Sequence, residues 1–302
     1  MTVTAVTPPT PQNSNLDRAM FLWAPDLSSD TKMQAILNFC SSNGANLIYL
    51  DIWALIGGSN WTTSNYQTLQ KFVHYCHASG IAVWALAGNV DWGHNQQWVM
   101  ANVVRRIAEY QALASAAPSS TTWELDGAFD GVMLDVEYWT VTGYTSTEPV
   151  GLIDLVVATK RILNLPVGTF LTQWLATSSG LSITYNGDTG YEGLVIMHHV
   201  DAVAVACYSN NGGGTNGATQ ITEFQPWFND ASATGTGKNC GLWCVSLTDS
   251  GQPSGESYNG ETKATMEQNH AAISSQFTAT PNTNAVFRGQ AIEQYSSWSQ
   301  MS

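Results

Sequence analysis

The sequence predicts an α/β fold, a single (β/α)8 TIM barrel. Two observations predict it: eight short apolar runs that are typical of buried parallel strands, and amphipathic helical patterns in the gaps between them. Successive runs start 27 to 50 residues apart, which leaves room for one strand, one helix and two loops. The chain has 302 residues, and one such barrel commonly takes about 250 residues or more.

The eight expected strands are nearly continuous apolar runs. Such runs favour parallel strands that are buried on both faces, against the barrel interior and against the helices. An open doubly wound sheet is the alternative, but it would need a phosphate-binding glycine loop after an early strand, and none follows the first strands. The glycine run 212–214 comes after the sixth strand, and we interpret it as a mobile loop. The strands are expected at Ala19–Pro25, Asn46–Trp53, Ile81–Asn89, Gly131–Glu137, Gly168–Trp174, Ala202–Tyr208, Gly241–Leu247 and Gly289–Tyr295.

Apolar residues between the strands recur at helical spacing. A first helix is expected over residues 33–40, where apolar side chains follow the i, i+3, i+4, i+7 pattern and Gly44 then ends the helix. Similar stripes lie over residues 69–76, 99–110 and 152–162. Each stripe predicts a helix with one face packed against the barrel.

No Pro- or Gly-rich linker interrupts the middle of the chain. We therefore expect one barrel domain over residues 16–302, preceded by a flexible segment over residues 1–15 that is rich in Thr and Pro. That segment has neither the basic nor the apolar region of a signal peptide. Because Ser, Thr, Asn, Gln and Gly provide most of the polar surface, the composition favours a secreted, extracellular protein.

The charge balance excludes two classes of partner. Ten Lys and Arg residues against 23 Asp and Glu residues give a net charge of −13, so we expect no nucleic-acid partner and no docking on an anionic membrane. No apolar run is long enough for a transmembrane helix. We expect no cofactor and no metal, because the chain has neither an H-E-x-x-H motif nor a zinc spacing of Cys and His. The sequence leaves the oligomeric state open.

The five cysteines are too few for a disulfide-built scaffold. Cys40 and Cys76 occupy matching positions near the ends of two expected helices, so they either bridge these helices or remain two buried thiols. Cys240 and Cys244 are separated by three residues, which is not a redox or zinc-knuckle spacing.

In a TIM barrel the functional residues lie where the strands end. The fourth expected strand carries the strongest signal, FDGVMLDVEY over residues 129–138. A period of two places Met133, Asp135 and Glu137 on the face toward the barrel axis, with Glu137 uppermost. An acid in such an apolar and aromatic setting has a raised pKa, as a general acid requires. The alternative is a buried polar network that only orders the core.

Carboxylates and aromatic residues gather at the other strand ends, although the protein is poor in charge. Aromatic rings stack on the C–H faces of sugars, and carboxylates accept hydroxyl hydrogen bonds or transfer protons. This combination predicts a carbohydrate site. The candidate substrate-binding residues are Trp23, Asp51, Asn89, Trp92, Gln173, Trp243, Glu293 and Tyr295.

Around the fourth strand the chain resembles the family 18 glycoside hydrolases, the chitinase-like barrels, whose signature is D-G-x-D-x-D-x-E. The resemblance implies that Glu137 protonates the leaving glycosidic oxygen and that Asp135 holds the N-acetyl group of the substrate. It also implies that Tyr208, at the end of the sixth strand, supports that group. The chain is even more similar to barrel proteins of that clan that carry FDG-x-x-LDVE and end in G-x-A-I-x-x-Y, here residues 289–295.

Three positions depart from the family pattern. Met133 replaces the middle Asp of the signature, Ser209 replaces the Asp after the Tyr, and no Trp stands at the end of the eighth strand. These changes put assistance by an N-acetyl group in doubt. If Glu293 faces inward, it lies across the barrel from Glu137 and offers a second carboxylate, whose distance from Glu137 would decide between retention and inversion. Asp51 and Asp249 are weaker candidates.

The sequence therefore predicts a glycoside hydrolase that cleaves a β-linked polysaccharide or oligosaccharide, and polymers with N-acetylated aminosugars are among the candidate substrates. Glu137, Asp135 and Tyr208 are its expected catalytic residues. The alternative is a catalytically inactive barrel that binds carbohydrate, as a lectin or as a toxin or adhesin component. The loss of the middle Asp at Met133 motivates this alternative.

Overall fold

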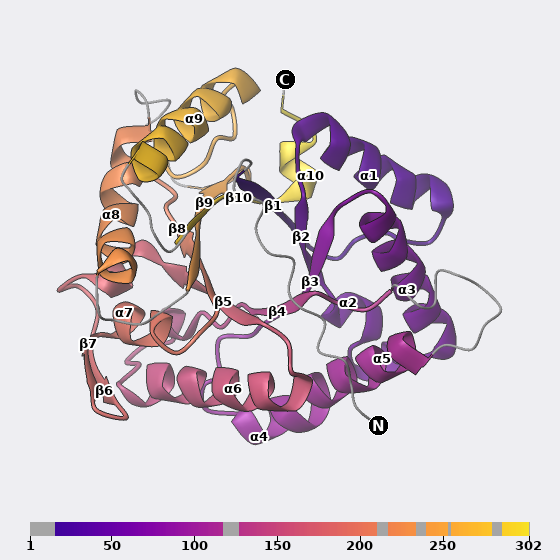
Figure 1. Cartoon of the computed structure of the whole chain (residues 1–302), viewed down its shortest axis with the longest axis horizontal. Helices are drawn as coiled ribbons and strands as arrows, with labels where there is room; N and C mark the ends of the chain where they lie inside the picture. Colours follow the sequence, from indigo (N-terminus) through magenta and orange to yellow (C-terminus); the bar gives the residue numbers. More distant parts are fainter. Residues whose placement is uncertain are drawn as a thin grey trace.

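All eight expected strands form one closed parallel barrel in the computed structural model, which describes residues 16–116, 127–209, 217–233, 240–252, 255–279 and 286–301. Helices surround the strands on all sides (Figure 1). The predicted (β/α)8 TIM barrel is confirmed. Around the barrel the strands follow the order β1 (Asp17–Leu22), β10 (Phe287–Glu293), β9 (Gly241–Leu247), β8 (Ala202–Ala206), β5 (Val167–Thr172), β4 (Gly131–Leu134), β3 (Ala82–Ala87) and β2 (Leu47–Asp51).

The four predicted helical stripes all lie on helices. Ser29 caps the first helix with its side chain, and Gly44 ends it in the left-handed conformation, at φ 67°. The longer helices are α1 (Asp30–Asn43), α3 (Thr63–Ala78), α5 (Arg105–Ala116), α6 (Thr147–Leu163), α8 (Ala218–Ser232) and α9 (Lys263–Ala279). The shorter ones are α2 (Trp53–Ile56), α4 (Gln96–Val99), α7 (Glu192–Met197) and α10 (Tyr295–Trp298), with a π-helical segment over Met100–Val104 and short 3-10 segments at Gly58–Asn60, Tyr138–Thr140 and Gln173–Ala176.

The strands are buried on both faces, as their continuous apolar character predicts. Inward side chains such as Phe21 and Met133 form one cluster that fills the barrel. Outward side chains such as Met20 and Val132 join a larger cluster between the strands and the helices. Along each strand the two clusters alternate residue by residue, so the strand period decides which side chains reach the barrel axis.

Polar residues just before the strands pair with the start of a neighbouring strand. Asp130 accepts a hydrogen bond from the backbone N–H of Val83 at 2.7 Å, and Asp201 accepts one from Val167 at 3.0 Å. Both carboxylates therefore accept a hydrogen bond from a backbone N–H at the end of the barrel where the strands begin, beyond the last hydrogen bonds between strands.

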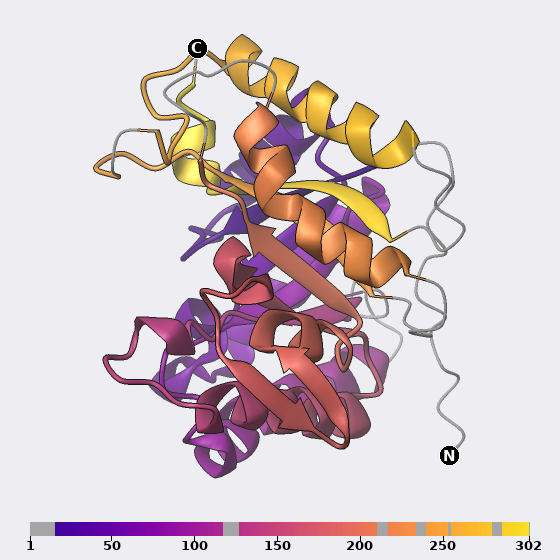
Figure 2. The same ribbon diagram turned by 90° about the vertical axis from the view of Figure 1, so that its left-hand side faces the viewer.

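A β-hairpin between β5 and β8 is the main element that the sequence analysis did not predict. It consists of β6 (Ser182–Tyr185) and β7 (Asp188–Tyr191), which pair antiparallel outside the barrel (Figure 2). The turn uses Asn186 and Gly187, both at positive φ, which is the preference of a two-residue type I′ turn. The hairpin leads into α7, whose first residue, Glu192, is important for the site.

All five cysteines are buried free thiols, so the second alternative for Cys40 and Cys76 is confirmed. Among the described residues, no helix combines the length and the apolar character needed to cross a membrane. The expected flexible segment over residues 1–15 and the glycine run 212–214 lie outside the described residues.

Candidate active site

The two acids of the fourth strand follow directly after β4. Met133 belongs to the cluster inside the barrel, whereas Val132, Leu134 and Val136 belong to the outer cluster. The predicted alternation is therefore confirmed, and it carries Asp135 and Glu137 toward the barrel mouth.

A close backbone contact fixes the position of Asp135. Its N–H donates to the carbonyl of Ala87 at 3.0 Å, which extends the pairing of β3 and β4 past their last residues. Gly88 follows Ala87, and a Cβ atom there would lie 1.7 Å from the carbonyl oxygen of Asp135. Only glycine fits at this position, so the end of β3 holds the backbone of Asp135 in place.

The environments of the two acids raise their pKa values. Among the described residues, the buried Oδ1 atom of Asp135 has no hydrogen-bond partner. Burial raises the pKa of Asp135 well above its usual range, and the neighbouring charges of Glu137 and Glu293 raise it further. Glu137 is half-buried, and burial also raises its pKa. Both groups therefore favour the neutral acid more than a carboxyl in water does.

Glu293 is the third carboxyl of the site. Ala291 lies in the inner cluster and Ile292 in the outer one, so Glu293, the last residue of β10, faces inward. Its Oε1 atom accepts a hydrogen bond from the indole N–H of Trp23 at 3.3 Å, and its Oε2 atom accepts one from the hydroxyl of Tyr208. Burial raises the pKa of Glu293, while the donors Tyr208 and Trp23 act in the opposite direction.

Tyr208 stands among all three acids. It lies two residues beyond β8 and packs against the inner cluster. Burial raises the pKa of its hydroxyl well above the usual value, and the charges of Glu293, Asp135 and Glu137 add to this effect. The phenol therefore stays protonated and acts as a hydrogen-bond donor in the site.

Aromatic rings surround these polar groups. Trp23 is half-buried, and its ring stacks on Phe21 with a centroid distance of 6.4 Å. Trp139, just after Glu137, has its ring centroid 6.5 Å from that of Phe170. Carboxyls beside partly exposed rings provide proton transfer and an apolar stacking surface at the same place.

Three further predicted residues lie at strand ends as expected. Asp51, the last residue of β2, accepts hydrogen bonds from the backbone N–H of Ala24 at 3.1 Å and of Trp53 at 2.9 Å. It thereby ties together the loops after β1 and β2. Asn89 is exposed on the loop after β3, and Gln173 is half-buried directly after β5.

Three other candidates have rings that pack against apolar neighbours, and their role in substrate binding stays a prediction. Trp243 is the third of seven residues in β9, below the strand end, and its ring packs against Tyr49 and Trp84 with centroids 6.4 and 6.3 Å away. Trp92 is only 5% exposed and belongs to the outer cluster. Tyr295 opens α10 and packs against Phe39 of α1, 5.1 Å between centroids.

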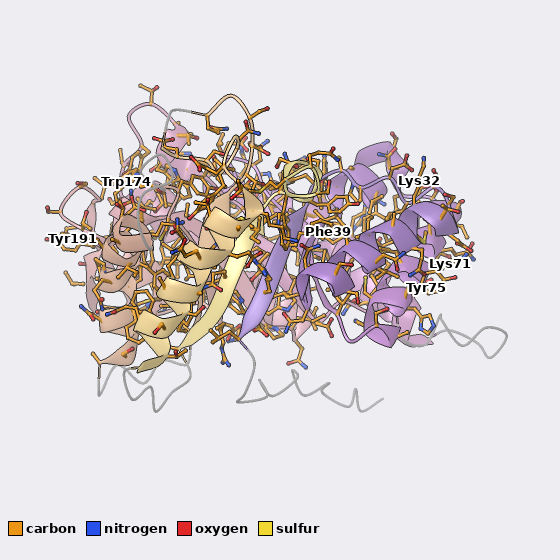
Figure 3. All side chains as sticks on the ribbon, turned by 90° about the horizontal axis from the view of Figure 1, so that it is seen from above. Lys32, Phe39, Lys71, Tyr75, Trp174 and Tyr191 are labelled. Atoms are coloured by element: carbon orange, nitrogen blue, oxygen red, sulfur yellow. The ribbon has the colours of Figure 1, made fainter. Side chains whose placement is uncertain are left out.

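Apolar burial explains why Trp92 and Trp243 are only 5% exposed, and the contact with Phe39 explains why the ring of the half-buried Tyr295 turns toward α1. Figure 3 labels Phe39, the partner of Tyr295 on α1, near the middle of the view, away from Trp174 and Tyr191 at its left. Asn210, which the sequence placed near the end of the sixth strand, lies outside the described residues.

A pair of exposed indoles lies at the same end of the barrel, and the sequence analysis missed one of the two, Trp98. Trp53 and Trp98 are 39% and 48% exposed, and their ring centroids lie 5.8 Å apart. They come from the loops after β2 and β3. Trp98 belongs to the short helix α4, whereas Trp53 ends the second expected strand.

Asp249 holds the residues that follow Glu293 in place. Both its oxygens accept hydrogen bonds from the side-chain amide of Gln294, at 3.0 and 3.1 Å, and the hydroxyl of Ser297 adds one at 2.9 Å. Gln294 follows Glu293, so Asp249 anchors the end of β10. Within the described part of the chain, no group of three or more His, Cys, Asp or Glu side chains could hold a metal ion.

Comparisons with known structures find TIM barrels of similar fold, several of them glycoside hydrolases. It is similar to an endo-1,4-beta-mannanase from Rhizomucor miehei, with 12% identity, a TM-score of 0.55, and coverage of 92% of this chain and 86% of that one. It is similar to a GH18 chitinase from Pseudoalteromonas aurantia, with 13% identity, a TM-score of 0.50, and coverage of 93% and 94%. An endo-beta-1,4-mannanase double mutant from Cellulomonas fimi matches with 14% identity, a TM-score of 0.52, and coverage of 93% and 66%.

The chain shares the barrel fold of these enzymes. At such low identity the likeness shows the fold alone. No protein family model matches the chain, and no curated protein sequence matches it. The chemistry of the site must therefore be argued from its own residues.

Proposed function

We propose that this protein is a glycoside hydrolase that cleaves a β-linked polysaccharide or oligosaccharide, with Glu137 as the general acid and base. One observation carries the proposal: Glu137 stands half-buried at the barrel mouth, in a group of three inward carboxyls that includes Asp135, whose Oδ1 atom finds no partner among the described residues. Burying several acids together is unfavourable unless their protonation is used.

The proposed chemistry follows from the protonation states. Burial raises the pKa of Glu137, which favours a carboxyl that carries a proton and donates it to the leaving glycosidic oxygen. Asp135 lies one step lower on the same face and orients the reacting group beside Glu137. Tyr208 donates a hydrogen bond to the same site.

The surroundings support a sugar substrate. Trp23 and Trp139 offer aromatic surface beside the acids, and the TIM barrels that the chain resembles in fold include a mannanase and a chitinase. The low proportion of charged residues, 11%, supports a secreted protein that acts outside the cell on such polymers. Asp51, Asn89 and Gln173 are proposed to bind the hydroxyl groups of the substrate.

The test is the substitution Glu137→Gln, which removes the proton donor but keeps the shape of the side chain. The wild type and the variant would be incubated with soluble β-mannan, cellulose and chitin oligosaccharides, and new reducing ends would be counted. We expect turnover to fall by about 10²–10⁴-fold. Glu109→Gln is the matched control, because Glu109 is an exposed helix residue paired with Arg105. Equal turnover by the wild type and the Glu137 variant would contradict the proposal.

A second candidate function is carbohydrate binding without catalysis. The buried, apolar Met133 favours it, because no second acid lies beneath Asp135 on the inner face of β4. Calorimetry with the same oligosaccharides separates the two functions. Binding without any product over several days favours a barrel that binds carbohydrate but does not cleave it.

A further inference from the structure

We propose that Glu293 is the nucleophile of this site, so that its substrates are β-glycosides that need no N-acetyl group at C2. This inference rests on the proposed glycoside hydrolase function. It assigns to the protein the task that the substrate's own acetamido group performs in the chitinase-like enzymes that the β4 motif resembles.

The topology places Glu293 opposite the general acid. In the closed barrel, three strands separate β10 from β4 in either direction. Both Glu293 and the Asp135–Glu137 pair face the axis at the ends of these strands. A sugar that enters along the axis therefore has Glu137 on one side and Glu293 on the other, which is the arrangement of the two carboxyls in a glycosidase.

The hydrogen bonds favour the ionised form of Glu293. The indole N–H of Trp23 can only donate, and it points to Oε1 at 3.3 Å. The hydroxyl of Tyr208 donates to Oε2. With a donor on each oxygen, the carboxylate is satisfied without a proton of its own, and such bonds are stronger when the acceptor is charged.

Asp135 has the opposite environment. Its buried Oδ1 atom finds no donor among the described residues. When two nearby carboxyls cannot both ionise, the proton settles on the one without donors. The negative charge of the group therefore belongs to Glu293, and Asp135 remains a neutral acid beside Glu137.

The alternative reaction, in which the N-acetyl group of the substrate attacks the anomeric carbon, lacks the acid that stands below Asp135 in the family pattern. Met133 occupies the inward position below Asp135, and it is fully buried in the inner cluster. Its methyl group would lie 3.1 Å from a Cβ atom on Gly168, so apolar packing fills this space. Asp135 consequently has no acid beneath it with which to exchange a proton.

The end of β10 is held firmly enough for a nucleophile. The backbone N–H of Gln294 donates to the hydroxyl oxygen of Thr248 at 3.1 Å, and the Gln294 side chain binds both oxygens of Asp249. These contacts follow directly after Glu293 and fix its backbone. A fixed carboxylate loses little conformational freedom in the reaction.

The reaction has two steps. A carboxylate oxygen of Glu293 bonds to the anomeric carbon, and the bond from this carbon to the glycosidic oxygen breaks, its electron pair passing to that oxygen as it takes the proton of Glu137. In the second step water attacks the anomeric carbon and gives its proton to the Glu137 carboxylate. The ester bond breaks, and its electron pair returns to Glu293.

The experiment first finds a disaccharide glycoside that the wild type hydrolyses, and NMR then records the anomer that forms first. The matching 2-deoxy-2-fluoro dinitrophenyl glycoside is added, and mass spectrometry of the intact protein and of its peptides locates any covalent sugar. We expect retention of configuration and one sugar on the peptide that contains Glu293. Glu293→Gln should lower turnover by about 10³-fold or more, and Glu109→Gln should leave it unchanged.

The outcomes separate this inference from the proposed function. Inversion of configuration, or cleavage restricted to 2-acetamido sugars without any labelled peptide, would overturn the role of Glu293 while the hydrolase stands. Sodium azide restoring turnover of Glu293→Ala, with an α-glycosyl azide as product, would support it even if Glu293→Gln folds poorly. A wild type that hydrolyses no glycoside overturns the proposed function and this inference together.

Discussion

Tyr138, the residue after Glu137, donates a hydrogen bond from its hydroxyl to the buried carboxyl of Glu192 at 3.0 Å. Glu192 also accepts hydrogen bonds from the hydroxyl of Tyr144 at 3.0 Å and from the backbone N–H of Leu181 at 2.8 Å. It comes from the first turn of α7, after the hairpin. An element inserted between β5 and β8 thus fixes the loop that carries Glu137, the proposed general acid.

Replacement of Glu192 should weaken both the fold and the site. Glu192→Ala leaves two hydroxyls and one N–H without their acceptor, and we expect a loss of about 2–4 kcal/mol in the free energy of unfolding. Turnover should also fall with little change in KM, because Glu137 moves with Tyr138. Urea denaturation and steady-state kinetics measure the two effects. Glu192→Gln, which keeps an acceptor and the shape, should recover most of both, and unchanged stability of the alanine variant would contradict this account.

The sequence was sufficient to predict the barrel and the inward face of β4. The strand runs and their spacing are local features, and the period of two along residues 131–137 does not depend on the neighbours. The inward direction of Glu293 could not be predicted in the same way. β10 has an irregular register between Phe287 and Gly289 against β9, and such a shift moves the following side chains to the other face.

The places of Trp243, Tyr295 and Glu192 depend on features that a local sequence pattern does not contain. Trp243 does face the axis, but its height depends on where β9 begins, and the strand continues to Leu247. Tyr295 follows Glu293 by two residues, yet the chain turns into α10 and carries its ring onto α1. The role of Glu192 depends on contacts with residues far from it in sequence, which no local pattern contains.

His198 should make stability depend on pH. Burial alone lowers its pKa, but its hydrogen bonds to Asp230 at 2.5 Å and to Asp188 at 2.7 Å outweigh burial and raise the pKa above the ordinary 6.5. The charged imidazole joins β7 to α8, and His199 lies 3.4 Å from the same Asp188 oxygen. Because the folded pKa is raised, the stabilisation is complete below pH 6.5 and is lost as the pH rises through the folded pKa.

The matching variant is His198→Gln. At about pH 6 we expect it to be less stable than the wild type by about 1–3 kcal/mol, since charge-assisted hydrogen bonds are lost. The difference should narrow as the pH rises, which urea denaturation at several pH values would show. A difference that stays constant across this range would mean that packing, and not the charge, determines the role of His198.

Restoring the Asp of the family signature at position 133 by a single substitution should not raise turnover. Met133 is fully buried in the inner cluster, so Met133→Asp places an acid among apolar side chains. We expect a loss of about 2–4 kcal/mol in the free energy of unfolding and no gain in turnover. Met133→Leu, which nearly conserves volume, should cost less than about 1.5 kcal/mol. Higher turnover of the Asp variant on 2-acetamido substrates would instead show that the site works through an N-acetyl group.

Asp135 should lower the free energy of unfolding at neutral pH, although it is proposed to take part in the reaction. Its pKa is raised well above 3.8 by burial and by the charges of Glu137 and Glu293. A carboxyl with a raised folded pKa favours folding below its unfolded pKa, and this contribution is lost as the pH rises through the folded value. The neutral amide of Asp135→Asn avoids that loss. The variant should therefore be more stable than the wild type at neutral pH and close to it at about pH 3.5, while its turnover falls.

Asp26 provides the control of opposite sign. It is exposed, and hydrogen bonds from Lys32 and Ser28 lower its pKa to about 2. Its contribution is present above pH 3.8 and is lost as the pH falls through the folded value, so Asp26→Asn should not stabilise the protein at neutral pH. Thermal unfolding of the wild type and both variants across this pH range measures the effect. If Asp135→Asn is destabilised at neutral pH, the acid is held by contacts that favour its charge, and the assignment of the proton to Asp135 fails.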